Sequence, residues 1–160
     1  MMGPMPDTRL DPVSRLHVIA AALPQAVIVQ RRLRVSFSAV WSVVADLERY
    51  APRYEAGVSA VRIVERQGVR LRLRVTLASG IEEAMEARLW SGWCLMQSST
   101  DVAGFAARPA GDGVLLAHLE HRRRPAARAR LRRSLVRSKL ERELDAIERL
   151  ASGESAADPR

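Results

Sequence analysis

Three side chains of the kinds that carry acid–base chemistry fall on the apolar sides of predicted strands: Glu83, His121 and Arg31. When the alternation of apolar and polar residues is continued along each strand, each of the three shares a face with apolar neighbours. A carboxylate, an imidazole and a guanidinium on an apolar face could polarise a carbonyl group and move a proton. We therefore predict Glu83, His121 and Arg31 as the catalytic residues if the protein is an enzyme.

A purely structural interpretation of the same three residues stays open. Glu83 and His121 lie near the ends of their predicted strands, where a one-residue bulge would turn both side chains towards solvent. Arg31 could extend from the rim of the sheet and keep its charge in water. The sequence alone does not decide between the catalytic and the structural interpretation.

Other common catalytic and metal-binding patterns do not occur in the sequence. It contains no glycine-rich phosphate loop and no GxSxG nucleophile motif. His118 and His121 are three residues apart on a predicted strand, so they point to opposite faces and are not expected to share a metal ion. Cys94 is the only cysteine, which excludes an intramolecular disulfide and a cysteine-based zinc site. We predict no metal site and no cofactor, and the cysteine content fits a reducing cytoplasm.

The strands that would position these residues follow from a period-two alternation. In 69–77 every second residue is apolar and faces one way, while arginines and a threonine face the other. Further strands are predicted at 26–35, 58–65, 81–90, 93–100, 103–109 and 114–123, with turn signals about every ten residues. Such short connections indicate an antiparallel meander. A helix over 38–50 follows the first strand, and a second short helix or turn follows Pro52.

One long helix is predicted near the C-terminus, over 125–150, because residues 126–151 contain no glycine or proline. Its apolar stripe comprises Val136, Leu140, Leu144, Ile147 and Ala151, and is extended by Leu131 and Leu135. The chain length suits one domain, which we place at 25–152. Residues 1–24 are expected to be a partly disordered leader that could include a short helix, and 153–160 a disordered tail.

The sequence is strongly basic, with a net charge of +8, and many of its arginines lie at the start of the long helix. Two interpretations stay open: the arginines only solvate the surface, or they dock an anionic partner such as RNA, an acyl carrier protein or a membrane. We expect no nucleic-acid partner and keep an acidic protein such as an acyl carrier protein as the alternative. No apolar run is long enough to span a membrane.

Three segments resemble the opening of the polyketide cyclase/dehydrase family in the START/SRPBCC superfamily: 35–41 (VSFSAVW), 46–52 (DLERYAP) and 57–65 (GVSAVRIVE). The strand from Val114 and the helix at 124–150 resemble its end, so the likeness covers about 25–152. The resemblance implies an α+β helix-grip fold, in which a seven-stranded curved antiparallel sheet wraps around a long C-terminal helix. Two short helices follow the first strand in this fold. The resemblance also implies a cavity between sheet and helix, with Tyr50 and Tyr54 at its mouth.

The expected function is to bind a small hydrophobic molecule, polyketide-like, aromatic or isoprenoid, in that cavity in the cytoplasm. A large set of inward-facing apolar side chains opposed by a single helix predicts an internal pocket of roughly a few hundred Å³. The predicted ligand-binding residues are Tyr50, Tyr54, Leu71, Leu73, Met85, Trp93 and Gln97. The protein could also promote cyclisation or dehydration of the molecule. The alternatives are a non-catalytic lipid or quinone carrier, and a ribosome- or RNA-associating protein that uses its basic surface.

Overall fold

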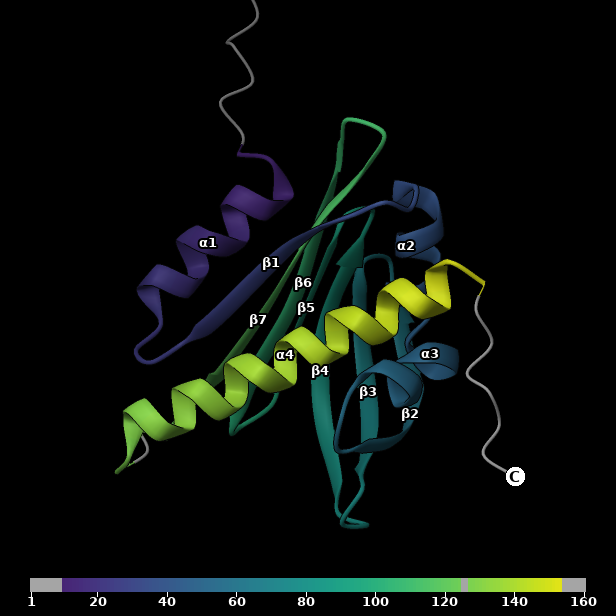
Figure 1. Cartoon of the computed structure of the whole chain (residues 1–160). Helices are drawn as coiled ribbons and strands as arrows, with labels where there is room; N and C mark the ends of the chain where they lie inside the picture. Colours follow the sequence, from purple (N-terminus) through teal and green to yellow (C-terminus); the bar gives the residue numbers. More distant parts are fainter. Residues whose placement is uncertain (1–9, 125–126, 154–160) are drawn as a thin grey trace, which may run out of the picture.

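A computed structural model describes residues 10–124 and 127–153 of the chain (Figure 1). The predicted leader and tail fall partly outside these described residues, at 1–9 and 154–160. The helices are α1 (Pro12–Ala22), α2 (Phe37–Val44), α3 (Leu47–Tyr54) and α4 (Ala129–Ala151). The strands are β1 (Val27–Leu33), β2 (Val58–Gln67), β3 (Arg70–Leu77), β4 (Glu82–Trp90), β5 (Trp93–Gln97), β6 (Asp101–Ala110) and β7 (Gly113–Arg122).

The seven strands form one antiparallel sheet in the order β1-β7-β6-β5-β4-β3-β2. The last strand, β7, pairs with the first strand, β1, so these two strands lie side by side in the sheet although they are far apart in the sequence. The sheet curves around α4, which lies across its concave face, and the short helices α2 and α3 close one end (Figure 1). This arrangement confirms the predicted helix-grip fold, with its two short helices after the first strand.

Side-chain caps set the starts of the three shorter helices. Asp11, Ser36 and Asp46 each accept a hydrogen bond from a backbone N–H in the first turn of α1, α2 and α3. Helix α4 begins at Ala129, and Arg128 at its N-cap position makes no side-chain capping bond; the predicted start at 125–126 lies outside the described residues. Among the helices that the structure describes, none combines the length and the apolar character needed to cross a bilayer.

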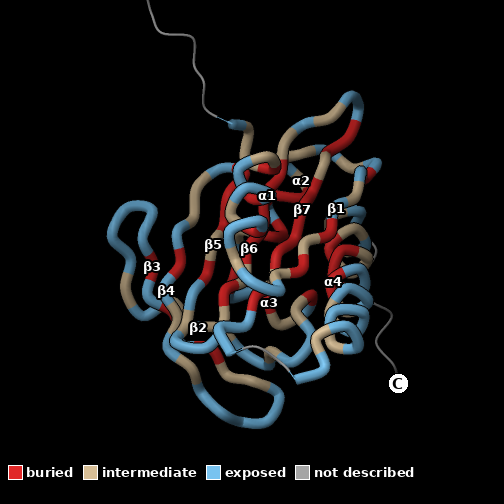
Figure 2. The backbone as a smooth tube through the Cα atoms, turned by 90° about the vertical axis from the view of Figure 1, so that its left-hand side faces the viewer, coloured by how far each residue is buried: buried red, intermediate tan, exposed pale blue. Residues whose placement is uncertain are grey.

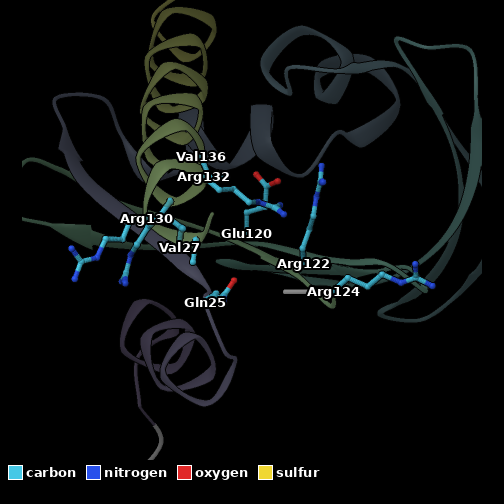
Figure 3. Close-up of a pocket in the computed structure, with 10 residues that line it drawn as sticks. Gln25, Val27, Glu120, Arg122, Arg124, Arg130, Arg132 and Val136 are labelled. Carbon is cyan, nitrogen blue, oxygen red and sulfur yellow. The ribbon is translucent and has the colours of Figure 1, made fainter. Parts of the chain in front are cut away.

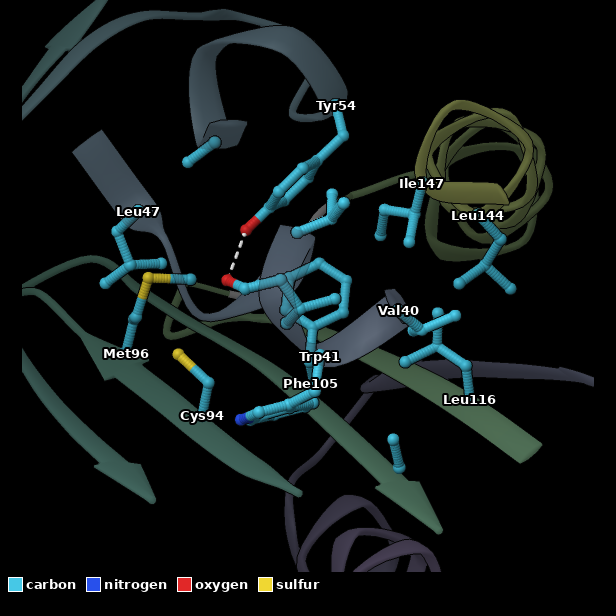
Figure 4. Close-up of a cluster of buried hydrophobic side chains, with 14 of the residues drawn as sticks. Val40, Trp41, Leu47, Tyr54, Cys94, Met96, Phe105, Leu116, Leu144 and Ile147 are labelled. Carbon is cyan, nitrogen blue, oxygen red and sulfur yellow. Dashed lines mark hydrogen bonds between the residues drawn. The ribbon is translucent and has the colours of Figure 1, made fainter. Parts of the chain in front are cut away.

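The larger core lies on the concave side, between the sheet, α2, α3 and α4. Figure 4 shows its centre, where Trp41 and Phe105 lie between Met96 on one side and Leu144 and Ile147 of α4 on the other. Leu140, Leu144 and Ile147 are all fully buried, as the predicted helix stripe requires. Burial of a leucine or isoleucine side chain contributes about 1.5–3 kcal/mol, so these contacts hold α4 against the sheet.

A second, smaller core lies on the convex side of the sheet under α1. Val13, Leu16 and Ala20 of this helix pack against a patch on β5, β6 and β7, formed by Trp93, Ala106, Ala117 and Leu119. Gly104 allows the close approach, because a Cβ atom at this position would lie 3.2 Å from Leu16 Cδ1. The central strands are therefore covered on both faces (Figure 2), and α1 is part of the folded unit.

The first turns of α4 differ from the predicted packing. Leu131 and Leu135 were expected to extend the buried stripe, yet they are 56% and 63% exposed. The prediction is wrong because, at about 100° per residue, Leu131 and Leu135 lie on the face of α4 opposite Leu140, while Val136 from the same turns faces β1 and β7. Only Val136 in this half of the helix contacts the concave core, and it is partly buried.

The contrast between Leu140 and Leu135 gives a direct test of how α4 packs. Leu140→Asp places an unpaired charge in the core and should lower the free energy of unfolding by about 3 kcal/mol or more. Leu135→Asp, on the exposed side of the same helix, should change it by about 0.5 kcal/mol or less. Urea unfolding followed by circular dichroism measures both, and equal effects of the two substitutions would contradict the packing described here.

Candidate functional site

A group of ionisable side chains is buried on the concave side of the sheet. Glu55 follows the last residue of α3, His118 lies on β7, and Glu143 lies on α4. His118 is 1% exposed and Glu143 2% exposed. One nitrogen of the imidazole and one oxygen of each carboxylate lie within 4.8 Å of one another. We call Glu55, His118 and Glu143 the buried cluster.

The members of the buried cluster face one another without bonding. His118 Nε2 lies 4.0 Å from Glu55 Oε1, and His118 Nδ1 lies 3.8 Å from Glu143 Oε2. Both distances exceed the length of a hydrogen bond. Within the described part of the chain, Glu55 Oε1, His118 Nδ1 and both carboxylate oxygens of Glu143 have no hydrogen-bond partner. Since buried polar groups are nearly always hydrogen-bonded in native proteins, this set is unusual.

The imidazole is held in place by an aromatic neighbour. The rings of Phe105 and His118 stack with centroids 3.8 Å apart and planes 15° from parallel. Phe105 in turn meets the ring of Tyr54 edge to face. The ring of His118 is thus fixed by packing, while its two nitrogens remain directed at the carboxylates.

Lys139 of α4 is the ammonium nearest to the buried cluster. Its Nζ donates a hydrogen bond of 2.9 Å to Glu120 Oε2 on β7 and lies 3.6 Å from Glu143 Oε1. A single ammonium group therefore lies among three carboxyl groups, those of Glu55, Glu120 and Glu143. Lys139 is also the only lysine in a chain that otherwise uses arginine.

Burial shifts the protonation of each member of the cluster. Loss of solvation, strengthened by the Glu55 carboxylate, raises the pKa of Glu143 to about 8, and burial raises the pKa of Glu55 to about 7. Burial, together with the nearby Lys139 charge, lowers the pKa of His118 to about 3. The imidazole is therefore neutral at physiological pH and can offer a lone pair.

A hollow of about 110 Å³ opens beside the cluster, between β1, β7 and the start of α4 (Figure 3). Val27, Ala129 and Val136 give it an apolar part. Glu120 also lines the hollow, so the residue that binds Lys139 connects this opening to the buried cluster. Arginines from the end of β7 and the start of α4 surround the opening: Arg122, Arg124, Arg130, Arg132 and Arg133.

A larger hollow of about 590 Å³ lies on the opposite face of the sheet, away from α4. Its floor is formed by β3 and β4, which carry Leu71, Leu73 and Met85 on their other side. Outward-facing arginines line it, namely Arg70, Arg72, Arg74, Arg88 and Arg123. Two of them make ion pairs, Arg72 with Glu65 and Arg74 with Glu82.

The structure does not bring the three predicted catalytic residues together. Arg31 lies on the concave side but forms an ion pair with Asp145 of α4 at the rim. Glu83 lies opposite Val75 in the β3–β4 pair and is partly buried, outside the buried cluster. His121 is buried on the convex side, because its strand neighbours Ala117 and Leu119 pack under α1.

The orientation predicted for Trp93, Gln97 and His121 is wrong. Trp90 pairs with Trp93 across the turn at 91–92, so Cys94 and Met96 face the concave core and Trp93 faces α1. Gln97 shares the face of Trp93 and is exposed. The error has a physical cause: with α1 on the convex side, β5 and β7 carry apolar residues on both faces, and alternation no longer marks the inner one.

The other predicted ligand-binding residues lie on the concave side. Leu71 and Leu73 are buried in the core, and Met85 packs against it. Tyr54 is also a core residue, and its hydroxyl donates a hydrogen bond of 3.0 Å to the carbonyl of Val44 (Figure 4). Tyr50 is partly buried, with the guanidinium groups of Arg49 and Arg53 over its ring.

Solved structures resemble this chain over most of its length. The protein TTHA0849 from Thermus thermophilus is 19% identical with a TM-score of 0.65, covering 82% of this chain and 99% of its own. A START superfamily protein from Mycobacterium smegmatis is 19% identical with a TM-score of 0.58, covering 80% and 97%. The chain has the same helix-grip fold as these structures.

A third similar structure has the name of an enzyme. The Zhui aromatase/cyclase from Streptomyces sp. R1128 is 16% identical with a TM-score of 0.54, covering 81% of this chain and 92% of its own. No protein-family model and no curated protein matches the sequence. At these identities the likeness establishes the helix-grip fold, and the site must be argued from the residues themselves.

Sequence reasoning missed the buried cluster, although two signals point to it. Glu143 lies three residues after Leu140 and four before Ile147, so it shares the apolar stripe of the helix. Lys139 is a lone lysine among many arginines. His118 was named only as the residue opposite His121, and Glu55 has no local pattern that would mark it as buried.

Replacement of Glu143 by a neutral residue should stabilise the protein. The pKa of Glu143 is about 8 in the folded protein against 4.5 for an ordinary glutamate, so the folded state holds the proton more tightly. The free energy of unfolding therefore falls as pH rises from about 5 to about 8. The ionisable groups that face Glu143 are Glu55, Glu120, His118 and Lys139. Glu143→Gln should raise the free energy of unfolding by about 1–2 kcal/mol at pH 8 and by less at pH 6.

The control for this experiment is Glu141→Gln, an exposed position on the same helix. It should leave the free energy of unfolding and its pH dependence unchanged within about 0.5 kcal/mol. Urea unfolding in the presence of a chelator measures both variants. A Glu143→Gln variant that is less stable than wild type at pH 8 would show that the carboxylate supports the fold.

Proposed function

We propose that the protein binds a small hydrophobic molecule that carries a polar group. The apolar body would lie between the sheet and α4, and the polar group would meet Glu55, His118 and Glu143. The observation that carries this proposal is the set of buried polar atoms without partners in the concave interior. A ligand atom in their midst would supply the missing hydrogen bonds or charge.

The start of α4 offers the entry route. The hollow between α4 and the β1–β7 edge already has apolar walls, and its volume of about 110 Å³ is small for a drug-sized ligand. The helix lacks a side-chain cap, and Leu131 and Leu135 gain no burial from their present position. An outward movement of these turns would therefore cost little and would enlarge the hollow towards the buried cluster.

The structural relatives support binding as the function at the level of the fold. One is a START superfamily protein and another an aromatase/cyclase. Two observations favour a carrier or sequestering role over catalysis by the predicted residues: Glu83 and Arg31 lie outside the cluster, and His121 faces the other side of the sheet. Cyclisation or dehydration of the ligand is the second candidate, favoured by an imidazole set between two carboxylates on the concave side.

Uptake of the apolar dye 1-anilinonaphthalene-8-sulfonate tests the binding proposal. Wild-type protein should bind the dye with a blue-shifted fluorescence, because the dye is apolar and the opening is basic. Val136→Trp fills the hollow from its wall and should weaken uptake by about tenfold or more. The matched control is Leu135→Trp, whose side chain points to solvent and should not change uptake.

The binding proposal fails if wild-type protein takes up no dye under conditions in which it is folded. It also fails if Val136→Trp binds the dye as tightly as Leu135→Trp does. Thermal unfolding of both variants is measured alongside, so that loss of uptake is attributed to the hollow only where the melting temperature is retained.

A further inference from the structure

The buried cluster has the composition and spacing of a metal site. Its three donors come from separate parts of the chain, the end of α3, β7 and α4, and the fold alone brings them together. Donor atoms bound to one cation at ~2.1 Å lie roughly 3–4 Å apart. In the cluster, one imidazole nitrogen and one oxygen of each carboxylate lie within 4.8 Å of one another, so a small contraction would bring the three donors to this range.

The unpartnered atoms point to an exogenous group at this place. Both oxygens of Glu143 and Nδ1 of His118 are buried and have no hydrogen-bond partner among the described residues. The stacking of Phe105 on His118 fixes the ring, as metal-binding imidazoles require, with its nitrogens facing the carboxylates. These are features of a preformed site, in which the donor atoms are already positioned around the place that one ion would occupy.

The charges of the region also call for a cation. Lys139 bonds Glu120 at 2.9 Å, and its approach to Glu143 is longer, at 3.6 Å. Lys139 is therefore engaged mainly by Glu120, and the carboxyl groups of Glu55 and Glu143 have no cationic partner of their own when they ionise. A divalent cation would balance the charges of both carboxylates, whereas an additional neutral hydrogen-bond donor would balance neither.

We propose that Glu55, His118 and Glu143 bind one divalent transition-metal ion. Two carboxylates and one imidazole suit Zn²⁺, Mn²⁺ or Fe²⁺ better than the soft metals that thiolates select, and better than Mg²⁺, which prefers oxygen alone. Three protein donors leave coordination positions free. If the proposed ligand binding holds, the polar group of the ligand occupies one of these positions; the metal site itself does not depend on it.

Titration of the chelator-treated full chain with Zn²⁺, followed by calorimetry, tests the site. Wild-type protein should bind one Zn²⁺ per chain and show a raised melting temperature. Co²⁺ in place of Zn²⁺ should give visible absorption of a low-symmetry site, a readout that needs no catalytic activity. Glu143→Gln and Glu55→Gln should each weaken binding by about tenfold or more, because each removes an anionic donor.

Two controls separate the proposed site from other binding. Glu120→Gln changes the neighbouring carboxylate that holds Lys139 and should retain one tight Zn²⁺. His17→Ala removes an exposed imidazole on the far side of the sheet, which is the alternative place for a surface-bound metal. The proposal is overturned if wild-type protein binds no Zn²⁺, or if binding survives in Glu143→Gln and Glu55→Gln but is lost in His17→Ala.

The outcomes distinguish the metal site from the ligand-binding proposal. Dye uptake is measured on chelator-treated protein, where the metal plays no part. Dye uptake without Zn²⁺ binding would refute the metal site and leave the cavity in place. Zn²⁺ binding without dye uptake would establish the metal site and refute the proposal that the protein binds a hydrophobic molecule.

Discussion

Helix α4 can bury Leu140, Leu144 and Ile147 only by burying Glu143 with them, because the four positions share one face of the helix. The apolar side chains hold the helix in the concave face of the sheet, and the carboxylate is carried into the interior by their packing. There it meets His118 and Glu55 at distances that leave all three without a direct bond. This enforced burial leaves in the core a carboxyl group whose two oxygens have no hydrogen-bond partner among the described residues.

The distribution of charge around this point has two zones of opposite sign. Arginines surround the opening at the start of α4, whereas carboxylates outnumber the one ammonium group inside. A molecule with an anionic group is attracted to the opening, and a cation is favoured within. Glu120 and Lys139 lie between the zones and link them through a hydrogen bond of 2.9 Å.

Much of the fold could be predicted from local patterns in the sequence. The alternation in β3 is clean because one of its faces is solvated. The helix predicted over 38–50 is instead divided between α2 and α3, with Asp46 as the cap of the second. The prediction of faces failed on β5 and β7, which α1 covers from the convex side. Since a strand buried on both faces has no polar side, alternation cannot distinguish Trp93 from Cys94, or His121 from His118.

The site was less predictable than the fold, because it depends on tertiary contacts. Glu55, His118 and Glu143 come from three elements, and no local spacing relates them. The position of Glu143 in the helix stripe was readable in the sequence, yet whether a polar residue in a stripe is buried depends on where the helix crosses the sheet. Leu131 and Leu135 show the reverse case, since they are apolar and were assigned to the stripe, yet they lie on the exposed face of the helix.

Native mass spectrometry of the full chain, freshly purified from its own host, tests most directly whether the interior of this protein receives an exogenous group. The account predicts that wild-type protein carries added mass, from a metal ion, a small molecule or both. That added mass should be absent from a Glu143→Gln variant prepared in the same way. A wild-type spectrum showing the bare chain, with the same result for the variant, would contradict it and would make the buried cluster an element of the core.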